Sequence, residues 1–418
     1  MSLVPIPPRG RAALSILACI GVLACGGGQG GGTPNAAPAA TPSTAPPLAI
    51  GSPLLTGTGS LPAPASNILP VRLDRGVRGT AFNTPFVTVT VCAPGGTTCR
   101  DIDHVMVDTA SYGLRLAAGA IPPDLVLPLT RSAEGTPVGQ CVHFSGGYLW
   151  GAVRNADVRL SGQAIAGLPI QVIADADPSF STPPATCSSS GPNLGTRIDA
   201  NGVLGVGMLR YDCGPACTSS TAPEIFFGCA ATGCTPVTLP LRQQPVNPVA
   251  MLDVHNNGVA LVLQQVPPGG AGSVEGALVL GIGTNGNNQL GAAQVMVPNG
   301  QHQLTTVYKG RPFPSFLDSG ANALFFPDGE LPSCGDLFCP AGPTTLQAQL
   351  QSPTGAQREI TFDIESVSHL SANTVAANIA GNDGGMVTWG LPFFFGRTVF
   401  VALKDAATPA GPGPYWAF

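Results

Sequence analysis

Two aspartates stand at corresponding places in two similar short segments, 210 residues apart. Asp108 follows an apolar run and precedes Thr-Ala-Ser, and Asp318 follows another apolar run and precedes Ser-Gly-Ala. Two carboxyl groups about 3 Å apart cannot both ionise, so they share one proton. The ionised group can act as a general base on water while the protonated group donates to a substrate carbonyl. The two motifs therefore predict an acid–base pair, provided that the fold brings them together.

The segments around the aspartates are typical of β-strands. Short apolar runs recur between turn residues from Asn67 onward, and the chain contains 55 Gly and 43 Pro, which favour turns over long helices. Alternation and β-branched residues within the runs favour strands. Strands are expected at 86–91, 105–107, 112–116, 153–160, 168–173, 259–266 and 277–280. One short helix is expected near 245–255, so the sequence predicts a mainly β protein.

The aspartate segments belong to a longer internal repeat. Each segment runs on into a second apolar strand, at 112–116 and at 322–326. Each is followed much later by a signal of two apolar residues and Gly, at 203–205 and, more loosely, at 388–390. Two copies of one supersecondary unit predict two lobes related by a pseudo-twofold axis.

This ordered set of segments resembles the pepsin-like aspartic peptidases, over about residues 69–418. The similar segments are the two aspartate motifs at 105–111 and 316–321, a flap hairpin and its return strand at 146–158, an apolar Gly-containing stretch at 201–207, the start of a second lobe at 273–281 and a closing segment at 389–401. The resemblance implies a bilobal fold of two pseudo-symmetric, β-barrel-like lobes. Asp108 and Asp318 would then face each other across a central cleft as the catalytic residues.

A second resemblance overlaps the first. The chain is similar to an uncharacterised family of bacterial lipoproteins marked by Asn-Pro-Val, here Asn247-Pro248-Val249. This family implies no activity, so the two resemblances together leave the activity open.

The peptidase resemblance gives roles to the residues beside the aspartates. The hydroxyls of Thr109 and Ser319 would brace the two aspartate loops against each other. Ser111 matches the position that hydrogen-bonds the aspartate of its own lobe, whereas its counterpart Ala321 has no hydroxyl. Ala110 departs from the family pattern, which has Gly there, because a Cβ crowds a backbone that approaches aspartate and substrate.

The resemblance also implies a substrate-covering hairpin, the flap, whose tip usually carries a tyrosine. Phe144 aligns best with that position, and Gly146 lies in the following turn. A phenylalanine covers a substrate but has no hydroxyl, so Tyr148 or Trp150 could take over the contact. The opposite interpretation is that two of these three aromatic side chains pack in the core. Substrate binding is therefore assigned to Phe144, Gly146 and Tyr148.

Other chemistries find little support in the sequence. Residues 281–286 read G-x-G-x-x-G after an apolar strand, but another turn follows where a dinucleotide site requires a helix. The five His are scattered, with no H-E-x-x-H and no G-x-S-x-G. The net charge is −5 and no Lys/Arg run exists, which argues against a nucleic-acid partner. We therefore expect neither a metal ion nor another cofactor.

The N-terminus is typical of an export signal. Arg9 and Arg11 precede an apolar stretch at 12–24 that is too short to span a bilayer. The stretch ends in V-L-A-C-G at 22–26, which resembles a bacterial lipobox and makes Cys25 the expected lipidation site. The alternative is an ordinary signal peptide that is cleaved at a small residue.

The cysteines agree with export. Ten of the 12 Cys lie beyond the lipobox, an even number that suits an oxidising compartment. Eight of them are close in sequence as Cys92/Cys99, Cys213/Cys217, Cys229/Cys234 and Cys334/Cys339, and Cys141 and Cys187 are left for each other. The absence of C-x-x-C and of His at zinc-ligand spacing makes a metal site a poor alternative.

These features divide the chain into four parts. Residues 1–24 are the signal peptide, 25–68 a Gly/Pro/Ala-rich linker that cannot bury enough surface to fold, 69–265 the N-terminal lobe and 266–418 the C-terminal lobe. The predicted function is an exported, lipid-anchored aspartic endopeptidase that acts on peptides or proteins. The alternative is a catalytically inactive pepsin-like lipoprotein that binds a ligand in the cell envelope. Either protein would be a monomer held by its N-terminal lipid, in the outer membrane if the host is Gram-negative.

Overall fold

The computed structural model describes residues 48–49, 61–267, 269–369 and 374–418. The predicted signal peptide, Cys25 and most of the predicted linker lie outside these residues. Strands dominate the described chain, so the predicted mainly β class is confirmed. The helical segments are α1 (Ala185–Ser188), α2 (Ala216–Ser219) and the 3-10 turns η1 (Ala118–Ala120), η2 (Pro178–Phe180), η3 (Leu194–Thr196), η4 (Leu241–Gln243), η5 (Pro248–Met251), η6 (Gly286–Asn288), η7 (Val367–His369) and η8 (Leu391–Phe394). Within the described residues, no helix has the length and apolar character needed to cross a membrane.

The larger sheet has 15 strands. In spatial order they are β11 (Gly233–Pro236), β10 (Phe226–Ala230), β6 (Val138–Phe144), β7 (Gly147–Leu160), β8 (Gln163–Ile173), β5 (Tyr112–Ala117), β9 (Gly202–Val206), β4 (Cys99–Asp108), β3 (Pro85–Cys92), β2 (Ile68–Leu73), β13 (Val274–Leu280), β12 (Gly258–Leu263), β24 (Arg397–Ala402), β27 (Tyr415–Ala417) and β14 (Val295–Met296). Strand β7 also pairs with β3, so the strands from β7 through β8, β5, β9 and β4 to β3 close into a ring.

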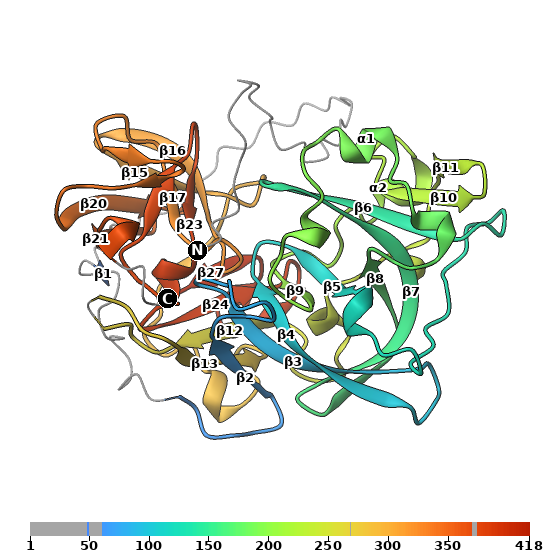
Figure 1. Cartoon of the computed structure of the whole chain (residues 1–418). Coiled ribbons are helices and arrows are strands. Elements are labelled where there is room, and N and C mark those ends of the chain that lie inside the picture. The colour runs from blue at the N-terminus through green and yellow to red at the C-terminus, as the bar shows by residue number, and fades with distance from the viewer. Residues whose placement is uncertain (1–47, 50–60, 268, 370–373) are drawn as a thin grey trace, which may run out of the picture.

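The second sheet has ten strands and comes mostly from the last third of the chain. In spatial order they are β1 (Leu48–Ala49), β21 (Gln357–Ile364), β20 (Thr344–Gln351), β15 (Leu304–Tyr308), β16 (Arg311–Leu317), β23 (Val387–Trp389), β17 (Leu324–Phe326), β22 (Ala380–Asn382), β19 (Leu337–Phe338) and β18 (Ser333–Cys334). A small hairpin of β25 (Ala407–Thr408) and β26 (Gly411–Pro412) completes the strands. Figure 1 shows the ten-stranded sheet on one side, strands β5 to β11 on the other, and β2, β12, β13 and β24 between them.

Strand β12, one of these middle strands, is hydrophobic on both faces. Every residue of β12 is buried, and both neighbours of β12 are antiparallel, β13 on one side and β24 on the other. A strand buried on both faces needs a continuous apolar run rather than an alternating one. The sequence G-V-A-L-V-L of β12 meets that requirement, and its side chains belong to two separate core clusters.

Two local expectations differ from the structure. The predicted helix near 245–255 is only the 3-10 turn η5, because the Asn247 side chain caps it and the chain is extended again at Leu252. Part of the predicted linker is structured, since β1 pairs with β21 and the buried Asn67 side chain donates to Leu280 O at 3.1 Å. The division into lobes at 265/266 stays a prediction; the boundary lies between β12 and the two strands that pair with it, β13 and β24.

All five predicted disulfides are present. They join Cys92 to Cys99, Cys141 to Cys187, Cys213 to Cys217, Cys229 to Cys234 and Cys334 to Cys339. Four of them close loops of a few residues, whereas Cys141–Cys187 joins β6 to α1 across 46 residues. Reduction of this one bond would therefore release the longest constrained segment.

Candidate active site

The two aspartates occupy the same place in two copies of one strand arrangement. Asp108 ends β4, and Asp318 directly follows β16. In the first copy, β9 lies between β4 and β5, parallel to the former and antiparallel to the latter. In the second copy, β23 lies between β16 and β17, parallel to β16 and antiparallel to β17. The internal repeat of the sequence is thus also a repeat of strand topology.

A glycine at the end of each inserted strand makes this packing possible. Gly205 is paired with Asp108, and a Cβ on it would lie 2.5 Å from the Tyr112 nitrogen. Gly390 follows β23, and a Cβ on it would lie 2.0 Å from the Ala323 carbonyl oxygen. Real Cβ atoms do not approach backbone atoms this closely, so both positions require glycine. The two apolar-apolar-Gly signals therefore mark the sites where each inserted strand passes the aspartate loop.

The two aspartate loops, residues 108–111 and 318–321, are cross-linked by reciprocal hydrogen bonds. The Thr109 amide donates to the Ser319 hydroxyl at 3.1 Å, and the Ser319 amide donates to the Thr109 hydroxyl at 3.0 Å. Each hydroxyl in turn donates to a backbone carbonyl of the other half, that of Leu317 at 3.3 Å and that of Val107 at 2.8 Å. Both side chains are buried. The four bonds fix the separation of the two loops.

This junction brings the two carboxyl groups together. A Cβ on Gly320, two residues after Asp318, would lie 3.0 Å from the Asp108 carboxyl carbon and 3.2 Å from Asp318 Oδ1. Burial raises the pKa of Asp318 well above its ordinary value, and the charge of Asp108 and the hydrogen bond between the two side chains raise it further. A raised pKa beside a second carboxylate is the condition under which a pair holds one proton. Asp108 and Asp318 are called the aspartate pair below.

The hydrogen bonds within each loop are similar but not identical. The amides of Ala110 and Gly320 each donate to the aspartate two residues earlier at 2.8 Å. Ala110 therefore makes the same turn as Gly320. Ser111 Oγ is a second donor to Asp108, at 2.5 Å, whereas the second donor to Asp318 within its own loop is the Ala321 amide, at 3.2 Å. The two carboxyl groups are thus held by different partners, a hydroxyl in one loop and a second amide in the other.

The three residues assigned to a flap have different environments. Phe144 is half-buried at the end of β6, and Gly146 lies in the turn between β6 and β7. Tyr148 is buried instead, in a cluster with Trp150, Phe180 and the Cys141–Cys187 disulfide. Tyr148 and Trp150 thus pack inside the protein, which matches the interpretation that two of the three aromatic residues belong to the core. Phe144 is left as the aromatic side chain at the hairpin tip.

Four residues near the site were not assigned from the sequence: Tyr112, Arg115, Gln140 and Asp212. Arg115 is completely buried, and its guanidinium carbon lies 5.9 Å from the centre of the Phe144 ring. The one available signal was the charge of Arg115 inside the apolar run 112–116, because a buried arginine requires a partner. Nothing in the spacing identified Asp212 as that partner.

The Asn-Pro-Val segment has a structural role behind the first aspartate loop. Asn247 is buried, its side-chain amide donates to Gly207 O at 2.8 Å, and its oxygen accepts the Val249 amide at 3.1 Å. Gly207 in turn donates its amide to Ser111 O at 3.0 Å. The motif therefore supports the loop that holds Asp108.

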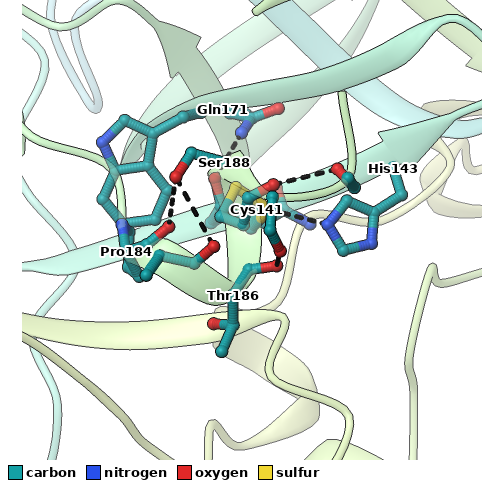
Figure 2. Close-up of a disulfide and its surroundings, with 12 residues drawn as sticks. Cys141, His143, Gln171, Pro184, Thr186 and Ser188 are labelled. Carbon is teal, nitrogen blue, oxygen red and sulfur yellow. Dashed lines mark hydrogen bonds between the residues drawn. A yellow bond between two sulfur atoms is a disulfide. The ribbon is translucent and has the colours of Figure 1, made fainter. Parts of the chain in front are cut away.

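Among the described residues, Cys141, His143 and Cys187 form a group of possible metal ligands. Figure 2 shows His143 directed at Cys141, with its Nε2 3.3 Å from the sulfur. Both sulfurs are joined in the disulfide, however, and a metal requires free thiolates.

The glycine-rich segment 281–286 leads into the 3-10 turn η6 rather than the helix that a dinucleotide site needs.

The fold and the site together define a class: a mainly β protein in which two copies of a strand–aspartate unit meet at a pair of carboxyl groups. The chain belongs to the family described as protein of unknown function (DUF3443), which matches residues 63–418. This match agrees with the similarity to an uncharacterised family that the Asn-Pro-Val segment indicated. No curated protein matches the chain.

Proposed function

We propose that this protein is an aspartic endopeptidase that hydrolyses peptide bonds with Asp108 and Asp318. The observation that carries the proposal is the junction of the aspartate loops, where four reciprocal hydrogen bonds hold two carboxyl groups in contact. A structural ion pair joins opposite charges, so it does not explain two carboxyl groups in contact. Burying two carboxyl groups side by side costs free energy unless one of them is protonated. Such a pair is suited to catalysis that uses one acid and one base.

The proposed architecture is the bilobal pepsin-like fold, with one strand–aspartate unit in each lobe. Its support is the identical insertion of β9 between β4 and β5 and of β23 between β16 and β17. The position of the hairpin tip adds to it, since Phe144 packs over Arg115, whose guanidinium donates to the carbonyl of Tyr112, directly after the first aspartate loop. In this proposal the hairpin covers the substrate as a flap.

The chemistry follows from the shared proton. The ionised member of the aspartate pair removes a proton from a water molecule, whose oxygen adds to the peptide carbonyl carbon. The protonated member gives its proton to the carbonyl oxygen, which forms a neutral tetrahedral diol. As the diol collapses, the aspartate that took the water proton gives it to the leaving nitrogen, the other aspartate removes a proton from a diol hydroxyl, and the carbon–nitrogen bond breaks to give an amine and a carboxylic acid. Neither a metal ion nor another cofactor takes part.

The proposed location is the cell envelope, with the protein held by a lipid on Cys25. Five disulfides support an oxidising compartment outside the cytoplasm. The substrates would then be peptides or exposed segments of exported proteins, and the folded part would act as a monomer. Mass spectrometry of the membrane fraction, with Cys25→Ser as the comparison, tests the lipid.

Peptide digestion tests the proposed activity. The mature protein is incubated with a mixed peptide library from about pH 3 to about pH 7.5, and the products are identified by mass spectrometry. Asp318→Asn should reduce cleavage at least about 100-fold, because a general acid–base group contributes about 10²–10⁴-fold. The matched control is Asp336→Asn, the same change at an exposed carboxylate in the same half of the chain, which should cleave at the parental rate. Cleavage by Asp318→Asn at the parental rate would refute the proposal.

A second candidate is a pepsin-like binding protein without catalysis. The observation that favours it is the hairpin, where Phe144 has no hydroxyl and Tyr148 is buried in the core. It predicts no cleavage at any pH but retention of an envelope peptide, measured by co-purification and calorimetry. Binding would persist in the double variant Asp108→Asn/Asp318→Asn, and its loss there would count against this candidate.

A further inference from the structure

The tip of the β6–β7 hairpin, residues 144–148, is covered on one side by a segment between α1 and β9. This segment, residues 188–199, is called the strap below. The Tyr148 amide donates to Pro192 O at 3.1 Å, and Tyr148 and Asn193 form a parallel β-bridge. The hairpin tip is therefore bonded to the strap through its backbone.

The contact between the hairpin tip and the strap is close enough to need glycine on both sides. A Cβ on Gly147 would lie 2.1 Å from Pro192 O, and one on Gly191 would lie 3.2 Å from the Gly147 Cα. These two glycines have φ values of +145° and +144°, which residues with a side chain rarely adopt. The Leu194 side chain reaches the turn itself, where its Cδ2 lies 3.7 Å from the place of a Cβ on Gly146. Backbone packed directly on backbone indicates that the two segments are fitted to each other.

A disulfide ties the first end of the strap to the hairpin (Figure 2). Cys187 directly precedes the strap, and its partner Cys141 lies on β6, three residues before Phe144. Both cysteines are only 1% exposed, so thiols in solution do not reach the bond. The disulfide is therefore a permanent tie, and the two segments cannot separate at this end.

The other end of the strap is held by hydrogen bonds to the loop between β2 and β3. The Arg78 guanidinium donates to the carbonyls of Thr196 and Arg197 at 3.1 and 2.5 Å. The Asp199 carboxylate accepts the amides of Arg78 and Thr80 at 2.5 and 2.7 Å and the Thr80 hydroxyl at 2.6 Å. The Arg78 side chain is 49% exposed, so water competes for its bonds. This set of bonds, called the latch below, is the end of the strap that can open.

We propose that the hairpin tip and the strap form a two-part lid of the proposed active site, which the disulfide keeps together and the latch releases. Phe144, at the hairpin tip, packs over Arg115 on β5, the strand that follows the first aspartate loop. A lid must open for substrate to enter and for product to leave. Opening at the latch leaves both the covalent tie and the fitted backbone contact intact, so it breaks the fewest bonds. The role as a lid rests on the proposed function, whereas the joint movement of the two segments does not.

Two amides report on the two contacts. The Thr80 amide is bonded to Asp199 in the latch, and the Tyr148 amide is bonded to Pro192 within the lid. Amide exchange of both is measured by NMR, with the amides of β12 as the reference for global unfolding. In the parent, the Thr80 amide should exchange at least about tenfold faster than the Tyr148 amide, after correction for intrinsic rates. Equal rates would refute the proposal, because the hairpin would then leave the strap whenever the latch opens.

A variant at the latch tests where the lid is released. Arg78→Met removes two hydrogen bonds and should speed exchange of the Thr80 amide at least about fivefold, but that of the Tyr148 amide less than about twofold. Arg75→Met is the matched control, the same change at an exposed arginine of the same loop, and should leave both amides at their parental rates. Equal acceleration of both amides in Arg78→Met would show that the two segments open separately and would overturn the proposal.

Variants within the lid should have the opposite effect. Gly191→Ala puts a Cβ against the hairpin backbone and keeps the disulfide, whereas Cys141→Ser/Cys187→Ser removes the tie. Each should speed exchange of the Tyr148 amide at least about tenfold relative to the amides of β12. The control is Gly233→Ala, at a glycine with a φ of +128° and no atom within 4 Å, which should leave the Tyr148 amide unchanged. A parental Tyr148 rate in both folded variants contradicts a lid that is held together in this way.

A ligand separates this inference from the proposed function. The probe is a statine-type peptide, which carries a hydroxyl where a substrate has its scissile carbonyl. Binding under the lid should slow exchange of the Thr80 amide at least about fivefold, because a ligand that binds the closed form shifts the population toward it. Binding without this slowing would refute the strap as part of the lid and leave the endopeptidase intact. If the probe does not bind and no peptide is cleaved, the endopeptidase proposal fails, and the exchange of the Thr80 and Tyr148 amides still decides whether the two segments open together.

Discussion

The hydroxyl of Thr109 is predicted to hold the two aspartate loops together, and Thr109→Val tests this. Valine keeps the shape of threonine but loses two hydrogen bonds: the one accepted from the Ser319 amide at 3.0 Å and the one donated to Leu317 O at 3.3 Å. Ser319 is fully buried, so its amide would be left without a partner in the interior. An unpaired buried group costs about 1–3 kcal/mol and a lost hydrogen bond about 1 kcal/mol, so unfolding should become easier by about 2–4 kcal/mol.

Ser319→Ala should cost a similar amount, because Ser319 makes the equivalent two bonds to the other half. The double variant should lose less than the sum of the single losses, by at least about 0.5 kcal/mol, since both hydroxyls hold the same junction. Urea unfolding followed by tryptophan fluorescence and far-UV circular dichroism gives the free energies. The control is Thr305→Val, the same change on β15 away from the junction, which should stay within about 0.5 kcal/mol of the parent. Losses below about 0.5 kcal/mol for both single variants at the junction would refute the reasoning.

The remaining predictions concern packing, cross-linking and pH. Gly390→Ala should destabilise the fold by about 1–3 kcal/mol or more, because the new Cβ meets a carbonyl oxygen at 2.0 Å, whereas Gly384→Ala, with no atom within 4 Å, should be near neutral in the same urea assay. Replacing both Cys141 and Cys187 by Ser should cost about 4 kcal/mol on the loop-entropy model, since the bond closes 46 residues, and a thermal scan that shows no loss would contradict that model here. The pKa of Asp328 is lowered: burial alone would raise it, but a tyrosine hydroxyl, a lysine ammonium and two amides outweigh burial. A carboxyl group whose pKa is lower in the folded than in the unfolded protein stabilises the fold at pH values above its unfolded pKa. This stabilisation is lost as the pH falls through the pKa of the folded protein. Asp328→Asn should therefore lower the urea midpoint at pH 7 and have little effect near pH 2, and an equal effect at both would show that charge is not involved.

Much of the local structure could be predicted from the sequence. The strands β3, β7, β8, β12 and β13 follow from short apolar runs between turn residues, since a strand needs only a few residues and its periodicity is visible locally. The predicted helix near 245–255 failed because a short periodic run does not outweigh a proline-started turn capped by Asn247. The neighbours of β12 could not be predicted, because its composition is the same whichever strands it joins, and its pairing with β13 and β24 is decided by the rest of the sheet.

Part of the candidate site could likewise be predicted from the sequence, and part of it could not. The aspartate motifs, the hydroxyls of Thr109 and Ser319, and the two glycine signals are repeated in the sequence, and a repeat of chemistry at equal places is visible without a structure. Tyr148 was assigned to ligand contact and lies in the core, because alternation along a strand does not tell which face a neighbouring element covers.

The sequence by itself determined that this chain is mainly β, that it repeats a strand–aspartate unit and that the ten cysteines from Cys92 onward are even in number and suited to pairing with one another. These properties follow from the types of residue that stand close together in the sequence and from one internal repeat. Only the tertiary structure decided that Arg115, Gln140 and Asp212 meet behind the first aspartate loop, because they come from three separate segments whose contact depends on long-range strand pairing. A buried cluster of charged and polar groups is thus a property of the fold, since charges act through space and not along the chain.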